Sequence, residues 1–516
     1  SGRLFASDGV TPVGAGETIV AAVGTSTVSL HSTSTAADGS YTITDISGNQ
    51  LGTSTPVVLF VDGGSVDATT LTVLASSTDT APAIDLVADT VTAITATSSL
   101  EIDLTRFAFY DSSDDADILH TSTGDSMNLT GSFTVAQAEG TELVGDGTVS
   151  STVKISDGEN GGPSLEQEDN AFGSAVTSIG DLDGDGVPDL AVGAEGDEPT
   201  SGGDGQEGAV HILFLNSDGT VSSTVKISDG ENGGPTLDNN DYFGSAVTSL
   251  GDLNGDGVPD LAVGAYLDEA TSGGDDEEGA VHILFLNADG TVSSTVKISD
   301  GENGGPGLDD YDNFGSAVTS IGDLDGDGVP DLAVGAQEDE PTSGGFSEGA
   351  VHILFLHASG SVKSTVKISE GENGGPTGLD ATSYFGSAVT SIGDLDGDGV
   401  PDLAVGAEQD QATSGGNVYE GAVHILFLNA DGTVSSTVKI SDGENGGPLL
   451  DLDDNFGSAV TSIGDLDNDG VPDLAVGAEN DEATSGGEGQ EGAVHILFLH
   501  ASGSVKSSVK ISDGEN

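Results

Sequence analysis

The stretch FGSAVTSIGDLDGDGVPDLAVGA, from Phe172 to Ala194, decides the fold because the chain repeats it. Each copy is followed by an acidic, Gly-rich stretch, the segment GAVHILFL, a short turn and the segment STVKISDGENGGP, all with small changes. Internal repeats of several tens of residues indicate units that must stack on their neighbours to bury a core. The copies begin at Phe172, Phe243, Phe314, Phe385 and Phe456, always 71 residues apart.

Each unit contains four short segments rich in Val, Ile and Leu and bounded by Gly, Asp and Asn, which is typical of β-strands and turns. Helical periodicity is absent. We therefore expect an all-β chain. In the first unit the expected strands are Ser174 to Ile179, Asp189 to Ala194, Ala209 to Leu215 and Ser223 to Ser228.

Four short antiparallel strands in one unit are the content of a propeller blade, so we predict a β-propeller in residues 149–516 with five complete units. An open linear array of stacked sheets is the alternative. A sixth copy of the fourth strand begins at Ser151, before the first complete unit. Either residues 83–148 supply a divergent sixth blade, or they form a β-rich connector and the chain was cut from a longer array.

Residues 1–82 lack the repeated sequence, and their short expected strands predict a small β-sandwich of the immunoglobulin-like or transthyretin-like kind. The run AADGSYTI, from Ala36 to Ile43, resembles the signature of carboxypeptidase-regulatory-like modules. That resemblance implies a sandwich that acts as a spacer. The expected strands are Thr18 to Val23, Thr27 to Ser32, Ser40 to Ile46 and Val57 to Val61.

The composition is strongly acidic: 88 Asp and Glu against 10 Lys and Arg give a formal net charge of -78. This charge excludes nucleic acid and anionic membranes as expected partners, and its self-repulsion requires cations or salt for a compact fold. Cysteine is absent, so disulfides cannot stabilise the chain. No apolar stretch is long enough for a membrane helix. Because the chain begins at Ser1 without Met, we expect a secreted or cell-surface protein that lost a signal peptide or was trimmed.

A nine-residue loop between the first and second strands carries the chemistry, and in the first unit it runs from Asp181 to Asp189. Carboxylates at loop positions 1, 3, 5 and 9 and a carbonyl at position 7 can converge on one ion, while Gly186 permits a sharp turn. Calcium prefers 6 to 8 such oxygen ligands, whereas magnesium requires stricter geometry. The alternatives are an acidic β-turn and an EF-hand, which needs a longer loop, a closing Glu and flanking helices.

Phe-Gly, the loop DxDxDGxxD and the strand DLAVGA together resemble the FG-GAP repeat of integrin α-subunit propellers and related prokaryotic surface proteins, over residues 149–516. The resemblance implies calcium at one end of the propeller, usually with seven blades. Asn254 at position 3 of the second loop is a neutral oxygen ligand, and Asn468 at position 4 of the fifth should not ligate. The implied calcium ligands are Asp181, Asp183, Asp185, Val187, Asp189, Asp252, Asn254, Asp256, Val258, Asp260, Asp323, Asp325, Asp327, Val329, Asp331, Asp394, Asp396, Asp398, Val400, Asp402, Asp465, Asp467, Asp469, Val471 and Asp473.

The units differ mainly in two loops, one after the second strand and one before the next Phe-Gly. Successive strands alternate direction, so both loops should lie at the end opposite the calcium loops. A variable loop face on a rigid scaffold is typical of ligand binding, although drift in unconstrained loops gives the same pattern. The residues expected there are Glu166, Glu168, Asp169, Asp241, Tyr242, Asp310, Tyr311, Tyr384 and Tyr419.

A histidine recurs in every third strand, but no nucleophile and base accompany it, so we predict a hydrogen-bonded structural role between blades and no enzyme activity. A lysine recurs in every fourth strand, where it offsets local acidity and discourages edge pairing. The histidines are His211, His282, His352, His424 and His495. The lysines are Lys154, Lys226, Lys297, Lys367, Lys439 and Lys510.

Two functions fit these observations. The first is a non-enzymatic, calcium-binding surface protein for adhesion or ligand binding, whose partner is a protein or a glycan. The second is a structural subunit that assembles with copies of itself into a filament, sheath or surface layer. The surplus strand at Ser151 favours the second function, because unpaired strand edges tend to find partners.

Overall fold

The computed structural model describes residues 153–165, 170–200, 205–270, 277–341, 348–411, 419–467, 469–481 and 492–512, together with residue 36 and the backbone of the strands before residue 151. The chain divides into two compact units, Ser1–Ser150 and Ser151–Asn516. The described part contains no helix long and apolar enough to cross a membrane.

The first unit contains strands in three sheets, ordered β4-β1-β7, β10-β9 and β11-β8-β6-β5-β2-β3. Two predicted strands are close to β2 and β5, while the predicted immunoglobulin-like sandwich stays a prediction. Residues 83–148 contribute β8 and β11 to the largest sheet, and their role as connector or sixth blade is not decided. The strands are β1 (Gly2–Phe5), β2 (Thr18–Val23), β3 (Ser29–Ser34), β4 (Ser40–Tyr41), β5 (Thr55–Val61), β6 (Ala68–Leu74), β7 (Leu86–Val87), β8 (Thr90–Thr95), β9 (His120–Thr123), β10 (Ser126–Leu129) and β11 (Ser132–Gln137).

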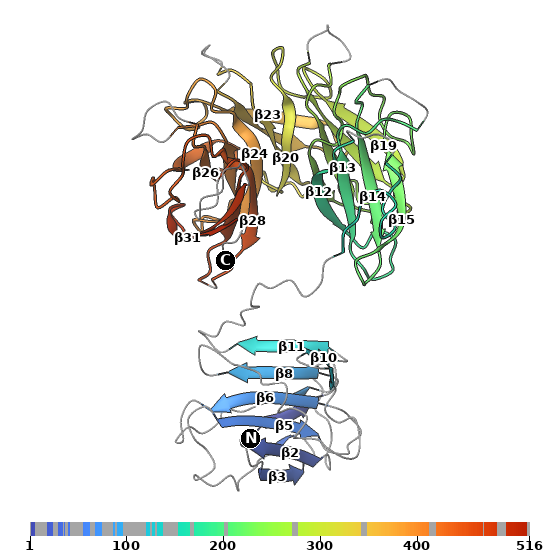
Figure 1. Cartoon of the computed structure of the whole chain (residues 1–516), viewed down its shortest axis with the longest axis vertical. Helices are drawn as coiled ribbons and strands as arrows, with labels where there is room; N and C mark the ends of the chain where they lie inside the picture. The colour runs from blue at the N-terminus through green and yellow to red at the C-terminus, as the bar shows by residue number, and fades with distance from the viewer. Residues whose placement is uncertain are drawn as a thin grey trace. The chain divides into compact units, whose positions relative to one another are not determined.

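The second unit is a five-bladed β-propeller of four-stranded antiparallel sheets, and each sheet follows the chain order of its strands. The first strands of successive blades pack against one another, and Figure 1 shows the sheets following one another from green to red. These five sheets are the predicted propeller blades, and ring closure between blades 1 and 5 stays a prediction.

The strand bounds repeat closely from blade to blade. Blade 1 contains β12 (Phe172–Gly180), β13 (Asp189–Ala194), β14 (Ala209–Leu215) and β15 (Val221–Ile227). Blade 2 contains β16 (Val247–Gly251), β17 (Asp260–Ala265), β18 (Ala280–Leu286) and β19 (Val292–Ile298). Blade 3 contains β20 (Phe314–Gly322), β21 (Asp331–Ala336), β22 (Ala350–Leu356) and β23 (Val362–Ile368). Blade 4 contains β24 (Phe385–Gly393), β25 (Asp402–Ala407), β26 (Ala422–Leu428) and β27 (Val434–Ile440). Blade 5 contains β28 (Phe456–Gly464), β29 (Asp473–Ala478), β30 (Ala493–Leu499) and β31 (Val505–Ile511).

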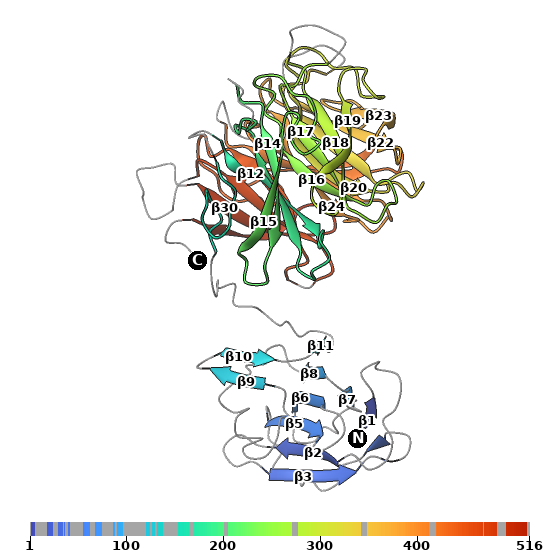
Figure 2. The same ribbon diagram turned by 90° about the vertical axis from the view of Figure 1, so that its right-hand side faces the viewer.

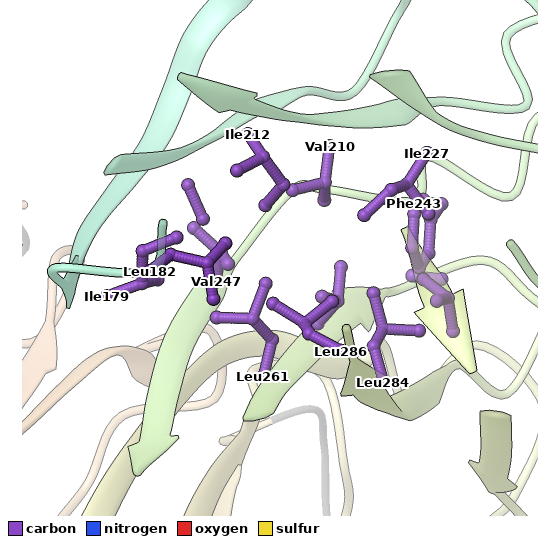
Figure 3. Close-up of a cluster of buried hydrophobic side chains, with 14 of the residues drawn as sticks. Ile179, Leu182, Val210, Ile212, Ile227, Phe243, Val247, Leu261, Leu284 and Leu286 are labelled. Atoms are coloured by element: carbon purple, nitrogen blue, oxygen red, sulfur yellow. The ribbon is translucent and has the colours of Figure 1, made fainter. Parts of the chain in front are cut away.

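The hydrophobic core lies between neighbouring blades. Val210 and Ile212 of blade 1 pack with Leu261 and Leu284 of blade 2 in one buried cluster, and Figure 3 shows these two sets of side chains facing each other. Equivalent clusters join blades 2 and 3, 3 and 4, and 4 and 5. Each blade therefore depends on its neighbour for burial, as expected for a repeat protein.

The small residues that recur in each copy of the repeat are required by close backbone contact between blades. A Cβ atom on Gly193 of blade 1 would lie 1.9 Å from the carbonyl oxygen of Gly244 in blade 2, so no larger residue fits. The amide of Phe243 donates to the carbonyl of Glu207 at 3.0 Å. The Phe-Gly of one repeat is thus fastened to the preceding blade, which explains the small residues there.

The two terminal blades keep an apolar face that the inner blades cover. Val494 in blade 5 is 41% exposed, whereas Val423 at the same position of blade 4 is fully buried. Val176 in blade 1 is 63% exposed, against 8% for Val247 in blade 2. These faces are uncovered among the described residues of the second unit.

The described part of the surplus copy of the fourth strand packs on blade 1. Ile155 contacts the apolar cluster of Val192, Leu213 and Val221. The carbonyl of Asn160 accepts a hydrogen bond from the amide of Val221 at 2.9 Å. The strand predicted from Ser151 begins outside the described residues, so it stays a prediction.

Candidate metal centre

The nine-residue loops lie at one end of every blade. In blade 1, Gly180 pairs with Asp189 at this end of the first two strands, and Phe172 pairs with Ala194 at the other. The register therefore confirms that the calcium loops and the variable loops lie at opposite ends of the blade. We call them the loop end and the variable end.

Position 1 of the loop organises the turn. One carboxylate oxygen of Asp181 accepts hydrogen bonds from the amides of Gly184 and Asp185, and the other accepts from Gly186, each at 2.9 Å. Gly186 has a φ of 92°, in the region that glycine adopts without strain. The sharp turn predicted at Gly186 is confirmed.

Position 9 fastens the loop to the rest of the blade. Asp189 is buried, and its two carboxylate oxygens accept from the amides of Leu182 and Leu215, each at 2.9 Å. Burial raises the pKa of the equivalent Asp260 and Asp402 to about 6, against the hydrogen bonds from the backbone. Each oxygen has a further lone pair, so a buried position 9 can hold the loop and still face a cation.

The structure brings the side chains of positions 1, 3 and 9 together. In four loops, one oxygen from each of the three carboxylates lies within 4.8 Å of the others. Such a set of hard oxygen donors fits calcium, and these clusters are typical of FG-GAP calcium sites. The four groups are Asp181, Asp183 and Asp189; Asp323, Asp325 and Asp331; Asp394, Asp396 and Asp402; and Asp465, Asp467 and Asp473.

The remaining predicted ligands lie in the same loops but outside these groups. In blade 2, Asn254 replaces the position-3 carboxylate, and its amide donates to Asp256 at 3.0 Å. At position 5, Asp185 accepts from the amide of Val187 at 2.8 Å. Ligation by position 5 and by the position-7 carbonyl stays a prediction. Asn468 lies outside the described residues.

Two loops contact a lysine from the fourth strand of the same blade, which the sequence analysis did not consider. Lys363 forms ion pairs with Asp327 and, at 3.4 Å, with Asp325 in blade 3. The hydrogen bond from Lys363 holds the pKa of Asp327 below its usual value. Lys506 makes the same contacts in blade 5, with Asp469 and, at 3.2 Å, with Asp467.

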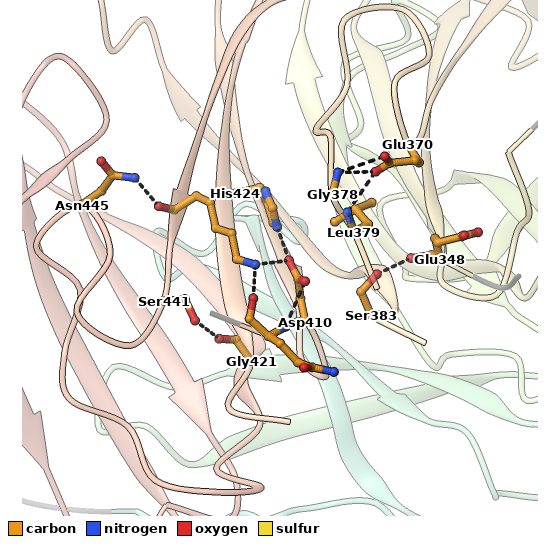
Figure 4. Close-up of polar contacts among 12 residues, drawn as sticks. Glu348, Glu370, Gly378, Leu379, Ser383, Asp410, Gly421, His424, Ser441 and Asn445 are labelled. Carbon is orange, nitrogen blue, oxygen red and sulfur yellow. Dashed lines mark hydrogen bonds and ion pairs between the residues drawn. The ribbon is translucent and has the colours of Figure 1, made fainter. Parts of the chain in front are cut away.

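The variable end holds a second set of carboxylates, which are buried and paired inside the protein. In blade 4, His424 Nε2 lies 2.8 Å from Asp410 Oδ2, and Lys439 Nζ lies 3.0 Å from the same atom. Figure 4 shows His424 beside Asp410. Burial alone would raise the pKa of Asp410, but His424 and Lys439 outweigh it and hold the pKa low. The same trio occurs in each blade.

This trio confirms that the histidine is hydrogen-bonded, but its partner lies in the same blade and not between blades. The trio also gives the lysines a more specific partner than general acidity. The aspartates were missed, although each is the one acid at a constant place in a variable stretch, three residues after the last Ala of the second strand. The exposed Lys154 lies apart from such a trio and pairs with Glu159 at 3.4 Å. The members are Asp197, His211 and Lys226; Asp268, His282 and Lys297; Asp339, His352 and Lys367; Asp410, His424 and Lys439; and Asp481, His495 and Lys510.

Blades 2, 3 and 5 add a second buried carboxyl group beside the trio. Burial, together with the charge of Asp268, raises the pKa of Asp241 to about 8. Burial likewise raises the pKa of Asp312 in blade 3 to about 8 and the pKa of Asp454 in blade 5 to about 6. The prediction that Asp241 belongs to an exposed binding face is wrong, because Asp241 turns inward and is only 2% exposed.

The other residues predicted at the variable end have mixed positions. Asp310, Tyr311 and Tyr419 are exposed, whereas Tyr242 and Tyr384 are half-buried. Two leucines that the sequence analysis missed, Leu449 and Leu452, are also exposed in the loop before the fifth Phe-Gly. Glu166, Glu168 and Asp169 lie outside the described residues.

The comparisons agree with this geometry. The FG-GAP repeat family matches the chain five times, at residues 172–213, 243–284, 314–354, 385–426 and 456–497. Among curated proteins, integrin alpha-5 of Xenopus laevis is 32% identical over 242 residues, covering 46% of this chain and 20% of that protein. Integrin alpha-V of Gallus gallus is 31% identical over 242 residues, with the same two coverages. Integrin alpha-4 of Xenopus laevis is 34% identical over 168 residues, covering 32% of this chain and 14% of that protein.

The chain thus matches about a fifth or less of the length of these relatives. Among solved structures, an α-L-arabinofuranosidase from Lactobacillus brevis aligns with a TM-score of 0.34 and 10% identity over 64% of this chain and 91% of that chain, which supports no inference. The matched repeats, the blade geometry and the acidic loops lead to one conclusion. The second unit is an FG-GAP repeat β-propeller related to integrin alpha subunits.

Proposed function

We propose that this chain is a non-enzymatic, calcium-binding protein of the cell surface or the extracellular space, and that its propeller binds a protein or glycan ligand in adhesion. The observation that carries the proposal is the convergence of three carboxylates in four loops of a propeller related to integrin alpha subunits. Calcium at these loops would fix the blade ends and offset part of the local negative charge.

The variable end is the proposed ligand face. Tyr311, Tyr419, Leu449 and Leu452 expose apolar area at this end, and aromatic side chains are common anchors of binding surfaces. Tyr311 also has a φ of 67°, a strained conformation for a tyrosine, and such strain is common at ligand-binding loops. The ligand face therefore combines these exposed aromatic and aliphatic groups with exposed acids such as Asp310.

Binding to immobilised glycans and extracellular proteins, measured with calcium and with chelator, tests this proposal. We expect a ligand whose binding falls at least about tenfold in the double variant Tyr311→Ser and Tyr419→Ser, because anchor residues carry most of the energy. The control is Val153→Ser, which removes an exposed apolar side chain away from the variable end. Equal loss in both variants, or binding that does not need the propeller, would reject the variable end as the ligand face.

Self-assembly is a second candidate, and the exposed apolar faces of blades 1 and 5 favour it. The face around Val494 is covered by the next blade at each of the four internal junctions, and blade 1 presents the matching face around Val176. A second copy could continue the series head to tail. Sedimentation of the full chain at rising concentration tests this: Val494→Asp should abolish oligomers, and a chain that stays monomeric throughout rejects the candidate.

A further inference from the structure

The hairpin between the third and fourth strands occurs in two versions. Blades 1, 2 and 4 read Asn-Ser/Ala-Asp-Gly-Thr-Val-Ser, starting at Asn216, Asn287 and Asn429. Blades 3 and 5 read His-Ala-Ser-Gly-Ser-Val-Lys, starting at His357 and His500. The second version replaces an aspartate by serine and a serine by lysine, so it makes the loop end of these two blades less negative.

The lysine of the second version reaches the acidic loop of its own blade. Lys363 pairs with the carboxylates at positions 5 and 3 of the blade 3 loop, Asp327 and Asp325. Lys506 pairs with the same two positions in blade 5. Both lysine side chains are mostly buried by these contacts, at 18% and 19% exposure. The hairpin sequence and the ion pairs therefore single out the same two blades.

The serine of the first version makes a different contact. In blade 1 the hydroxyl of Ser222 donates to the carbonyl of Phe214 at 3.0 Å, and in blade 4 the hydroxyl of Ser435 donates to Phe427 at 3.1 Å. Across the described residues, the loops of blades 1, 2 and 4 form no ion pair with a lysine. In blades 1 and 4 backbone amides donate to the loop carboxylates, and in blade 2 the side-chain amide of Asn254 also donates to Asp256.

A lysine that pairs with the loop carboxylates competes with a metal ion for the same oxygens. The ammonium group has three donors and no acceptor, so it can satisfy two carboxylates but cannot join a metal site. Position 3 belongs to the group of converging carboxylates in blades 3 and 5. A calcium ion that uses this position must therefore compete with the lysine for the carboxylate, and ligand charge is a main determinant of calcium affinity.

We propose that Lys363 and Lys506 divide the loops into two classes, and that the loops of blades 3 and 5 bind calcium more weakly than those of blades 1 and 4. This inference rests on the proposed calcium-binding function. In the weaker class the lysine acts as an internal counter-cation, so these loops are also less destabilised when calcium is removed. The loop of blade 2 belongs to neither class, because Asn254 lowers its negative charge without a lysine.

The test uses the full chain and the double variant Lys363→Ser and Lys506→Ser, which installs the residue that blades 1, 2 and 4 carry. Calcium titration by calorimetry should show two loops tightened by about tenfold. In chelator, the melting temperature of the variant should fall below that of the natural chain. The reverse variant, Ser222→Lys and Ser435→Lys, should weaken two loops and raise the melting temperature in chelator.

Lys154→Ser is the matched control, because it removes one positive charge from an exposed lysine that contacts no acidic loop. It should leave the calcium titration unchanged. Calcium binding that is the same in the natural chain and both loop variants overturns the two-class inference while the proposed function stands. Absence of calcium binding in all of them overturns both.

Discussion

The exposed aspartates of the loop end and the buried aspartates of the variable end differ in their partners. At the loop end, Asp181 and Asp183 are exposed and their local partners are backbone amides. At the variable end, Asp197 is buried, with His211 and Lys226 as its partners. An exposed carboxylate is solvated by water and remains available to bind an ion from solution. A buried carboxylate needs a partner within the chain, because an unpaired buried charge is very costly. The loop end is therefore the part expected to respond to calcium.

The largest expected effect is the removal of calcium, which acts on the loop end alone. With dissociation constants of about 10⁻⁴ to 10⁻³ M, roughly 10 mM calcium would stabilise the fold by about 1.4 to 2.7 kcal/mol per site. Excess chelator should lower the melting temperature and increase protease cleavage, and Asp327→Asn with Asp331→Asn should reproduce part of the loss in blade 3. Unchanged stability in excess chelator would falsify a structural role for calcium.

The next effect breaks the variable end. Lys297→Ala leaves the buried Asp268 with the contact to His282 Nε2 but without its lysine, and losing one member of a buried ion pair costs about 3 kcal/mol. Lys154→Ala is the control from the same sequence context, and its exposed ion pair with Glu159 is worth about 1 kcal/mol or less. Denaturant unfolding at fixed calcium measures both. Equal costs for the two lysines would contradict the distinction between buried and exposed pairs.

A smaller effect depends on pH and separates blades 2 and 3 from blades 1 and 4. The folded-state pKa of Asp241 is raised to about 8, so the protonated form stabilises the fold fully below pH about 4 and this contribution is lost as the pH rises toward 8. Asp241→Asn should therefore be neutral at pH 4 and stabilising by on the order of 2 kcal/mol at pH 8.

The chain itself offers the control for this pH effect. Blade 1 has Asn170 and blade 4 has Ser383 at the position of Asp241, so Ser383→Asp should introduce the pH-dependent loss that Asp241→Asn removes. Thermal unfolding of each variant against the natural chain, across pH 4 to 8, gives the difference. A constant difference over this range would reject the raised pKa.

The smallest effect returns to the loop end. Asn254→Asp gives the blade 2 loop the position-3 carboxylate that the other four loops have. Calcium affinity of this loop should rise several-fold, because it gains a charged ligand, while stability in chelator should change by less than about 0.5 kcal/mol. Asn239→Asp adds the same charge in an exposed loop at the variable end. A gain in affinity from this control would show that overall charge, and not the loop, sets the affinity.

Much of the loop end could be predicted from the sequence, because the loop is local. Nine consecutive residues with acids at alternate positions, plus Gly186, largely determine a turn whose oxygens converge, and the strand bounds followed the Val-rich segments closely. The variable end could not be predicted in the same way. Asp197, His211 and Lys226 come from separate parts of the blade and meet through the strand register, in which His211 lies opposite Lys226.

The predictions that were wrong or incomplete share this cause. Asp241 is acidic and lies in a variable loop, so the sequence favours exposure, yet the loop folds inward over the trio of blade 2. From the sequence, Lys363 is expected to be one more exposed lysine, but the hairpin brings it into contact with the acidic loop of blade 3.

By itself, the sequence determined the all-β class, the five repeats, the four strands of each and the position of the acidic loops, since all of these follow from local patterns repeated at a fixed interval. The tertiary structure alone decided which carboxylates are buried, which lysines neutralise them, and which apolar faces stay uncovered. The physical reason is that burial and charge pairing arise between strands and between neighbouring blades, where residues distant in the chain come within a few ångströms of one another.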